Sequence, residues 1–297
     1  LVVRFGRNPF MLLIERRIIT MKKVLITGAA GYIGRHVVKE FLDHNYMVYA
    51  NDLNNKGIDD RATIIDYPIF DGNRDIFSRL GEPDILVHLA WRDGFIHNSN
   101  AHMEDLSKHM IFLNNMMAGG LKSISVMGSM HEVGCWEGAI DENTPCNPMS
   151  MYGVAKNALR QALLLKTRNS DVAVHWLRAY YIYGDDMRGS SIFSKIVQAA
   201  EDGKEEFPFT LGENQYDFIH IDELAKQIYH ASVQDKEQGI INVCSGVPVP
   251  LKDQVEKFIK DKKLNILLKY GAYPDREYDS PKVWGNPERI NRIMGVK

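Results

Sequence analysis

Residues 24–34 read Val-Leu-Ile-Thr-Gly-Ala-Ala-Gly-Tyr-Ile-Gly, a short apolar run followed by three glycines at the spacing GxxGxxG. The run predicts a buried strand, and residues 32–43 predict a helix that begins directly after the glycines. Glycines suit such a turn because a Cβ would block the close approach of phosphates and the packing of helix against strand. Three glycines alone also fit an ordinary turn. The stretch therefore predicts a strand, a turn and a helix whose backbone N–H groups face a pyrophosphate.

Two further features favour the nucleotide-binding interpretation of this turn. Asp52 follows a second apolar run at about the distance where a ribose-binding carboxylate is expected. Tyr152 and Lys156 are four residues apart, which places them on one face of a helix. A lysine ammonium and the positive nicotinamide of a bound cofactor can lower the pKa of a nearby tyrosine from its usual value of about 10, so that the phenol exchanges a proton near neutral pH. An isolated pair of this kind also fits a helix surface, but the glycine-rich turn in the same chain favours a reactive pair.

Composition narrows the class of protein. The 297 residues are 45% hydrophobic and 25% charged, enough for one large core with or without a smaller lobe. The net charge of -2 provides no electrostatic footprint for a nucleic acid polymer or an anionic membrane. The three cysteines lack CxxC spacing and the ten histidines lack metal-binding spacing, so we expect no disulfide framework, no metal site and a reducing, cytoplasmic location.

The first twenty residues are treated as an N-terminal extension. They precede Met21-Lys-Lys, which resembles a natural start directly before the first strand. Their apolar run is short and interrupted by charges, so we expect neither a membrane span nor a signal peptide there.

From Met21 onward, short β-branched runs alternate with longer helical patterns, which predicts parallel βαβ units. The expected fold is α/β, a Rossmann-type doubly wound parallel sheet with a smaller α/β substrate-binding lobe. The expected strands are 23–27, 47–51, 62–65, 85–89, 123–127 and 173–177, and the expected helices 32–43, 103–117, 152–167, 222–232 and 251–260. Residues 21–184 are assigned mainly to a dinucleotide-binding domain, and residues 185–297 mainly to the lobe, interleaved with that domain.

The motifs together resemble an extended short-chain dehydrogenase/reductase of the NAD-dependent epimerase/dehydratase family. The resemblance covers nearly all of residues 21–297. Its elements are GAAGYIG (28–34), Asp52, Asp66, His88-Leu-Ala90, Met127-Gly-Ser129, YGVAK (152–156), Leu177-Arg-Ala-Tyr-Tyr-Ile-Tyr-Gly184, Tyr216-Asp-Phe-Ile-His-Ile-Asp222 and Asn242-Val-Cys-Ser-Gly246.

The resemblance implies roles for these residues. Tyr152 is the acid/base, Lys156 holds the nicotinamide ribose, and Ser129 hydrogen-bonds the reacting carbonyl. A carboxylate at Asp52 disfavours a 2′-phosphate, which implies NAD, although Arg35 leaves NADP open. The implied cofactor-binding residues are Gly28, Gly31, Tyr32, Ile33, Gly34, Asp52, Leu53, Asp66, Tyr67, Leu89, Ala90, Trp91, Tyr152 and Lys156.

The residues after Ser129 bear on the reaction. Sugar 4,6-dehydratases of the family carry an acidic pair there, because eliminating water needs additional proton transfer. Met130 cannot transfer a proton, whereas His131 is a candidate substrate-binding residue. The stretches 90–97 and 130–138 resemble bacterial dTDP-4-keto-6-deoxyhexose reductases, which make dTDP-fucose or dTDP-6-deoxytalose. The resemblance implies an NAD(P)H-dependent 4-ketoreductase of a nucleotide-linked 6-deoxyhexose in surface polysaccharide synthesis, such as dTDP-4-dehydro-6-deoxyglucose to dTDP-fucose.

Two other functions stay open. A nucleotide-sugar C4 epimerase uses the same serine, tyrosine and lysine, and recycles its NAD internally. A nucleotide-sensing protein of the same fold is disfavoured because Tyr152 and Lys156 are both present.

The sequence also departs from many epimerases. Tyr181 and Tyr216 stand where those enzymes carry an asparagine and an arginine. Phosphate recognition is therefore assigned to Arg188 and Arg276, whose guanidinium groups suit a pyrophosphate. The resemblance also implies a homodimer through helices 152–167 and 103–117, and Leu159, Leu163 and Leu164 fit either that contact or packing on the sheet.

Overall fold

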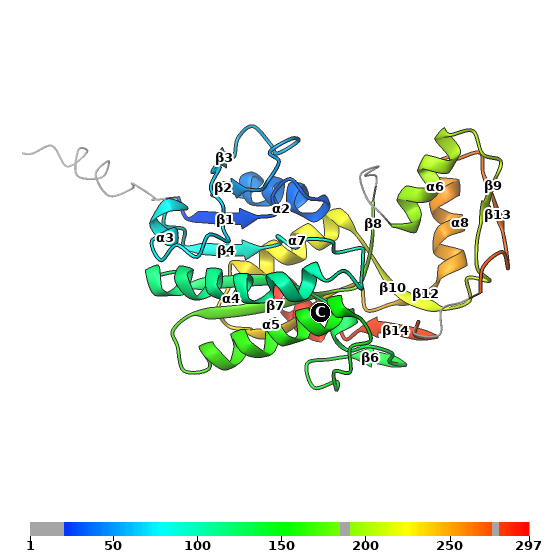
Figure 1. Ribbon diagram of the computed structural model, residues 1–297. Helices are drawn as coiled ribbons and strands as arrows, with labels where there is room; N and C mark the ends of the chain where they lie inside the picture. Colours follow the sequence, from blue (N-terminus) through cyan, green and yellow to red (C-terminus); the bar gives the residue numbers. More distant parts are fainter. Residues whose placement is uncertain (1–20, 185–190, 275–278, 297) are drawn as a thin grey trace, which may run out of the picture.

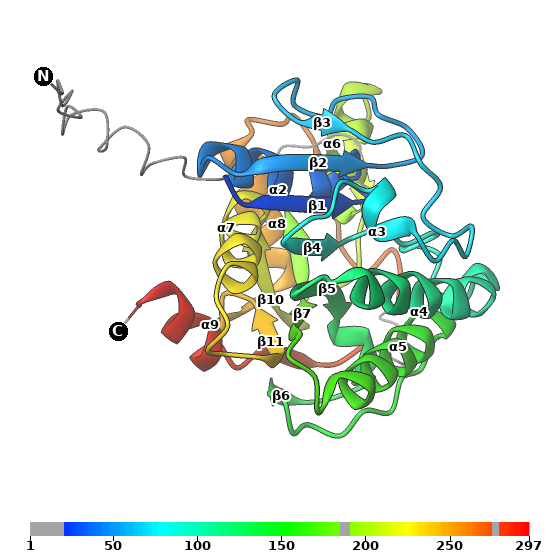
Figure 2. The ribbon, with the colours of Figure 1, turned by 90° about the vertical axis from the view of Figure 1, so that its left-hand side faces the viewer.

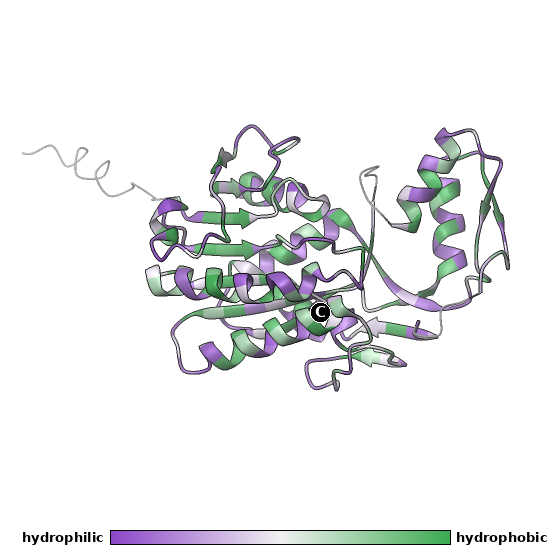
Figure 3. Cartoon of the chain, in the orientation of Figure 1, coloured by the Kyte–Doolittle hydropathy of each residue, from purple (hydrophilic) through white to green (hydrophobic). Residues whose placement is uncertain are grey.

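The computed structural model describes residues 21–184, 191–274 and 279–296. Its main feature is a seven-stranded parallel sheet of doubly wound order (Figure 1). Across the sheet the strands are β11 (Gly239–Val243), β7 (Ala173–Ala179), β5 (Ser123–Ser129), β4 (Ile85–His88), β1 (Lys23–Thr27), β2 (Met47–Asn51) and β3 (Thr63–Ile64). β1 and β4 are buried on both faces, which explains their continuous apolar sequences (Figure 3).

Helices cover both faces of this sheet (Figure 2). One face carries α2 (Tyr32–Asp43), α7 (Ile221–Ser232) and α9 (Glu288–Met294), and the other carries α3 (Ile76–Arg79), α4 (Ala101–Gly119) and α5 (Met151–Thr167). The buried positions of α2 include Val37, Val38 and Phe41, at helical spacing. On α5, Leu159 and Leu163 have no exposed surface and pack into the core under the sheet, so they do not belong to a subunit contact.

A smaller lobe lies beyond the carboxyl ends of the large sheet (Figure 1). Its sheet contains β12 (Pro248–Pro250), β10 (Gln215–His220), β14 (Lys282–Gly285) and β6 (Gly138–Ile140), with β8 (Tyr181–Tyr183) paired to β10. It also contains α6 (Ile192–Glu201), α8 (Leu251–Asp261) and the strand pair β9 (Glu206–Pro208) and β13 (Leu267–Lys269). A core that includes Phe193, Phe218 and Phe258 joins these elements. The 3₁₀ turn η1 (Met130–Glu132) connects β5 to this region.

The α/β architecture predicted from the sequence is confirmed, but the expected number of strands is wrong. The sequence predicts six strands in the large sheet, and the structure adds β11 as a seventh, parallel to β7. Its five residues lie within the stretch assigned to the lobe, and so short an apolar run does not reveal which sheet it joins. After β10 the chain thus returns to the large sheet.

We searched the part of the chain that the structure describes for membrane-spanning helices. None of its helices has both the length and the apolar character that a crossing requires.

Candidate active site

The glycine-rich turn lies between β1 and α2, where the strand order of the sheet reverses. Gly28 has a φ of 70°, and a Cβ there would lie 2.7 Å from the Ala90 backbone nitrogen after β4. A Cβ on Gly34 would lie 2.1 Å from the Gly28 carbonyl oxygen, and a Cβ on Gly31 would lie 3.1 Å from it. No side chain caps the N-terminus of α2, and its first turn carries no acidic residue. The turn therefore fits an anionic pyrophosphate against backbone N–H groups.

Asp52 follows β2 and faces this turn. Its Oδ2 accepts a hydrogen bond from the Ala30 backbone N–H (2.9 Å), and its Oδ1 accepts one from the Leu53 backbone N–H (2.7 Å). Each carboxylate oxygen can accept more than one hydrogen bond, so the group can still bind ribose hydroxyls. The Leu53 side chain is fully exposed, so Leu53 contributes to the site through its backbone N–H.

Asn51 arranges the neighbouring loop, a function that the sequence did not reveal. Its buried amide donates hydrogen bonds to the carbonyl oxygens of Ile65 (2.9 Å) and Tyr67 (2.8 Å). These bonds bring the segment of Asp66 and Tyr67 to the end of β2, beside the residues expected to hold the ribose. The adenine contact assigned to Asp66 and Tyr67 stays a prediction. The sequence signal that could have identified Asn51 was its position, a polar residue at the end of an apolar strand.

The structure brings Ser129, Tyr152 and Lys156 together. Ser129 ends β5, while Tyr152 and Lys156 lie in the first turns of α5. Ser150 caps this helix by accepting a hydrogen bond from the Gly153 backbone N–H (3.1 Å). A Cβ on Gly153 would lie 2.2 Å from a carbonyl oxygen of η1, so α5 packs directly on the segment after Ser129. The Ser129 hydroxyl lies close enough to the Tyr152 phenol to affect the pKa of that phenol.

Burial dominates the pKa values of Tyr152 and Lys156. Burial raises the pKa of Tyr152 to about 12, the Glu132 carboxylate raises it further, and the Ser129 hydroxyl lowers it. Burial also lowers the pKa of Lys156 to about 7. The Lys156 Nζ donates to the Met127 carbonyl oxygen (2.7 Å) and lies 5.8 Å from the centre of the Tyr152 ring. Burial thus dominates the pKa of Tyr152 in the chain alone, and the lowering expected from Lys156 together with a positive nicotinamide stays a prediction.

Trp91 covers the reactive lysine. Its ring centre lies 3.7 Å from the Lys156 Nζ, its indole N–H donates to His102 Nδ1 (3.0 Å), and its ring stacks on His109 at 4.4 Å. The face of an indole attracts a cation. Trp91, which follows the predicted cofactor residues Leu89 and Ala90, thus favours the ammonium form of Lys156.

Replacing Trp91 by Leu is expected to move the alkaline limb of the pH–rate profile to lower pH by about 1.5 pH units. The ring stabilises a buried ammonium by about 2 kcal/mol, so its removal lowers the pKa of Lys156 further. The ammonium form then disappears at a lower pH. The profile of kcat/KM would be measured from about pH 5 to about pH 9. Trp91→Phe retains a ring face and is the control; coincident profiles for wild type and Trp91→Leu would contradict this role.

A pocket of about 60 Å³ lies beside these residues. The His131 ring centre is 6.0 Å from that of Tyr152, and His97 stacks on Tyr152 at 5.5 Å with an angle of 11°. His131 is thus close to the reactive tyrosine, and its role in substrate binding stays a prediction. His97 was missed, although it lies in the stretch 90–97 that the sequence singled out. The lining residues are His97, Asn98, Met130, His131, Gly134, Met149, Ser150, Tyr181, Asp279 and Ser280.

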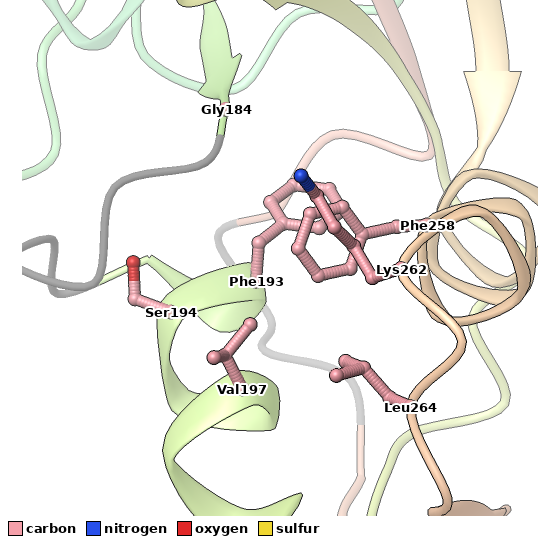
Figure 4. A pocket seen from close by; sticks show the side chains of 7 residues that line it. All are labelled: Gly184, Phe193, Ser194, Val197, Phe258, Lys262 and Leu264. Atoms are coloured by element: carbon pink, nitrogen blue, oxygen red, sulfur yellow. The ribbon is translucent and has the colours of Figure 1, made fainter. Parts of the chain in front are cut away.

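A second pocket, of about 110 Å³, lies in the smaller lobe between α6 and α8 (Figure 4). The rings of Phe193 and Phe258 line it, and the Lys262 side chain lies beside them. The other lining residues are Gly184, Ser194, Val197 and Leu264. Arg188 and Arg276, assigned to the pyrophosphate from the sequence, lie outside the described residues. Within those residues no cluster of side chains suited to a metal ion is found.

A glycine-rich turn at the reversal of a doubly wound sheet, a carboxylate after the second strand and a serine–tyrosine–lysine group define an oxidoreductase of the extended short-chain dehydrogenase/reductase type. The sequence pattern of the NAD dependent epimerase/dehydratase family matches residues 24–244. The chain belongs to this family, and it is an NAD-dependent oxidoreductase that modifies nucleotide sugars.

Similar proteins include the dTDP-6-deoxy-L-talose 4-dehydrogenase (NAD(+)) of Aggregatibacter actinomycetemcomitans. It is 44% identical over 271 residues, which cover 88% of this chain and 98% of that protein. Two solved structures share the fold. A UDP-N-acetylglucosamine 4-epimerase from Methanobrevibacter ruminantium has a TM-score of 0.79 at 20% identity, with 92% of each chain covered. MoeE5 in complex with UDP-glucuronic acid and NAD has a TM-score of 0.77 at 22% identity, also with 92% of each chain covered.

Proposed function

We propose that this enzyme interconverts the C4 hydroxyl and the C4 ketone of a dTDP-linked 6-deoxyhexose, with NAD as hydride acceptor and NADH as donor. The observation that carries the proposal is the contact of Ser129 with Tyr152 beside a pocket in which Met130 follows the serine. This site has a hydroxyl pair for one proton transfer, while methionine offers no second one for dehydration. The 44% identity to a dTDP-6-deoxy-L-talose 4-dehydrogenase supports the same reaction.

Each residue of the site has a separate role in binding NAD or in the transfer of the proton. Gly31, Gly34 and the start of α2 hold the pyrophosphate, and Asp52 holds the ribose hydroxyls. NAD, when bound, supplies the hydride acceptor and a positive charge that favours the phenolate. Tyr152 takes the C4 hydroxyl proton during oxidation and returns it during reduction. Ser129 donates a hydrogen bond to the C4 oxygen and keeps it in line with the phenol.

The two pockets fit the two ends of a nucleotide sugar. Tyr181 lines the pocket beside Tyr152, and Gly184 lines the pocket between α6 and α8. Two residues of extended chain separate Tyr181 from Gly184, which span about 10 Å. We assign the hexose to the first pocket and the thymidine to the second, whose aromatic rings suit a base. Lys262 is then a candidate for the negative charge of the diphosphate.

Oxidation and reduction are two directions of one reaction through the same transition state. The sequence predicted the reductive direction, and the name of the Aggregatibacter relative gives the oxidative one. Because C4 becomes planar in the ketone, the face from which hydride is delivered sets the configuration at C4 and at no other centre. Of the two products that the sequence named, dTDP-fucose and dTDP-6-deoxytalose, the relative supports the second.

The test is NADH formation at 340 nm with dTDP-6-deoxy-L-talose and NAD. One NADH per ketone formed, with slower turnover when NADP replaces NAD, supports the proposal. The reverse assay supplies the isolated ketone with NADH and should regenerate dTDP-6-deoxy-L-talose. The C4 epimerase is the alternative, because 4-epimerases share this fold. Inversion at C4 without added NADH, and without released NADH, would establish the epimerase instead.

We also propose a homodimer in a reducing cytoplasm. α4 and α5 expose apolar side chains, among them Ile111, Val154 and Leu165. Val154 and Leu165 are eleven residues apart, so they share one face of α5. The three cysteines are unpaired, which agrees with a reducing compartment. Sedimentation of the wild type against Leu165→Glu tests the dimer, and a monomeric wild type would contradict it.

A further inference from the structure

A carboxylate without any solvent exposure lies behind the reactive serine. Glu132 is the last residue of η1, and its Oε1 accepts hydrogen bonds from the Ser129 backbone N–H (2.7 Å) and from the Trp176 indole N–H (2.8 Å). The Ser129 Oγ accepts a hydrogen bond from the His131 backbone N–H (3.3 Å). These bonds form a capping box. The serine side chain accepts a hydrogen bond from the backbone of η1, and the Glu132 carboxylate accepts one from the backbone N–H of Ser129. Glu132 thus holds the main chain of the residue whose hydroxyl contacts Tyr152.

Two arginines flank the other oxygen of this carboxylate. The Glu132 Oε2 lies 3.2 Å from Arg160 Nε and 3.5 Å from Arg178 Nη2. Arg160 belongs to α5, eight residues after Tyr152, and Arg178 is a fully buried residue of β7. A single carboxylate therefore connects β5, β7 and α5, two of which carry the reactive hydroxyls.

Nearby glycines make room for this arrangement. A Cβ on Gly128 would lie 2.2 Å from Trp176 Nε1 and 2.7 Å from Glu132 Oε1. Gly134 has a φ of 84°, and a Cβ there would lie 2.0 Å from the Asn147 carbonyl oxygen. The chain on either side of η1 thus approaches its neighbours more closely than any larger residue allows.

A structural role for η1 does not account for so much buried charge. Longer helices of this chain begin with a serine alone: Ser150 caps the seventeen residues of α5, and Ser191 caps the ten residues of α6. The three-residue η1 instead has a buried carboxylate between two guanidinium groups, an arrangement that is costly to desolvate and contributes little net stability. What distinguishes η1 from those helices is that its capping serine contacts Tyr152.

We propose that Glu132 is a positioning residue, which fixes the Ser129 hydroxyl toward Tyr152 and the substrate oxygen through the capping box and the two arginines. The inference rests on the proposed function of Ser129. Glu132 touches neither substrate nor cofactor, and its effect on catalysis passes through the serine. Loss of Glu132 should therefore lower kcat while KM for NAD changes little.

The experiment is a double-mutant cycle between Glu132 and Ser129. Ser129→Ala is expected to lower kcat about 100-fold, because it removes a hydrogen bond to the reacting oxygen. Glu132→Gln should lower kcat about 10- to 100-fold in the wild type and less than about threefold in the Ser129→Ala background. A merely structural Glu132 would cost the same factor in both backgrounds, and that result would overturn the proposal.

Asp217→Asn is the matched control, because Asp217 is an equally buried carboxylate whose hydrogen bonds come from Ser245, Gly246 and Gly285 and not from Ser129. Its effect on kcat should be equal in both backgrounds. If Glu132→Gln does not fold, Arg160→Gln disturbs the same carboxylate from its partly exposed side, and its kcat loss should also vanish without the serine hydroxyl. Full activity of Ser129→Ala would overturn the proposed role of Ser129 itself, which distinguishes that failure from a failure of Glu132 alone.

Discussion

Tyr152→Phe is expected to lower kcat about 1,000-fold, because the phenol is the group that exchanges the C4 proton. The substitution keeps the ring, so the stacking with His97 at 5.5 Å and the contact with Trp91 at 6.1 Å remain. NADH formation from dTDP-6-deoxy-L-talose measures the loss. The melting temperature and the dissociation constant for NAD, measured in parallel, should stay close to those of the wild type.

The control for this substitution is Tyr229→Phe. Tyr229 is a buried tyrosine of α7, packed on Phe41 on the opposite face of the large sheet from α5, so its hydroxyl is remote from the chemistry. We expect this variant to retain kcat within about twofold. Tyr152→Phe with near-normal turnover would mean that another group, such as His97 or His131 in the pocket, moves the proton.

Gly34→Ala is expected to abolish NAD binding and to lower the free energy of unfolding by about 3 kcal/mol. The added Cβ would lie 2.1 Å from the Gly28 carbonyl oxygen and 2.8 Å from the Ala29 Cα. Both contacts are with backbone, which cannot rotate away as a side chain can. The start of α2 must shift, and the turn then loses its fit to the pyrophosphate. Urea denaturation and calorimetric titration with NAD measure the two effects.

Gly31→Ala tests the effect of the turn on NAD binding separately from its effect on the free energy of unfolding. Gly31 is exposed, and its φ of -67° and ψ of 172° suit any residue. A Cβ there lies 3.1 Å from the Gly28 carbonyl oxygen, a tight contact that a small shift relieves. We expect a stability change below about 1 kcal/mol together with at least a tenfold loss of NAD affinity, because the methyl group enters the phosphate cradle. Equal stability losses at the two glycines would contradict this assignment.

The sequence predicts best where a local pattern determines the structure. β1, β2 and α2 have the expected bounds, because a continuous apolar run and a helical spacing are strong signals over these lengths. β5 and β7 extend two residues beyond their predicted ends, and the expected strand 62–65 shortens to Thr63–Ile64. In this last case both strand residues are exposed, so burial does not sustain a longer strand.

The site was predicted less completely than the fold. The identities of Ser129, Tyr152 and Lys156 follow from spacing, and the structure places them together. His97 contacts Tyr152 through packing between distant segments, which no spacing along one chain reveals. Ser129 and Glu132 stand at the S-x-x-E spacing of a capping box, a local signal that was missed. The lowered pKa of Lys156 likewise depends on burial, and burial emerges only when β5, α4 and α5 are assembled.

The late return of the chain to the large sheet bears on how the protein folds during synthesis. β7 is a buried strand between β5 and β11, and α7 packs on α2. A nascent chain that has emerged only as far as β10 therefore exposes one edge of β7 and one apolar face of the sheet. Unpaired strand edges of this kind are templates for aggregation. The large sheet is complete only when residue 243 has emerged, so the edge of β7 stays unpaired while β8 and β10 are being made.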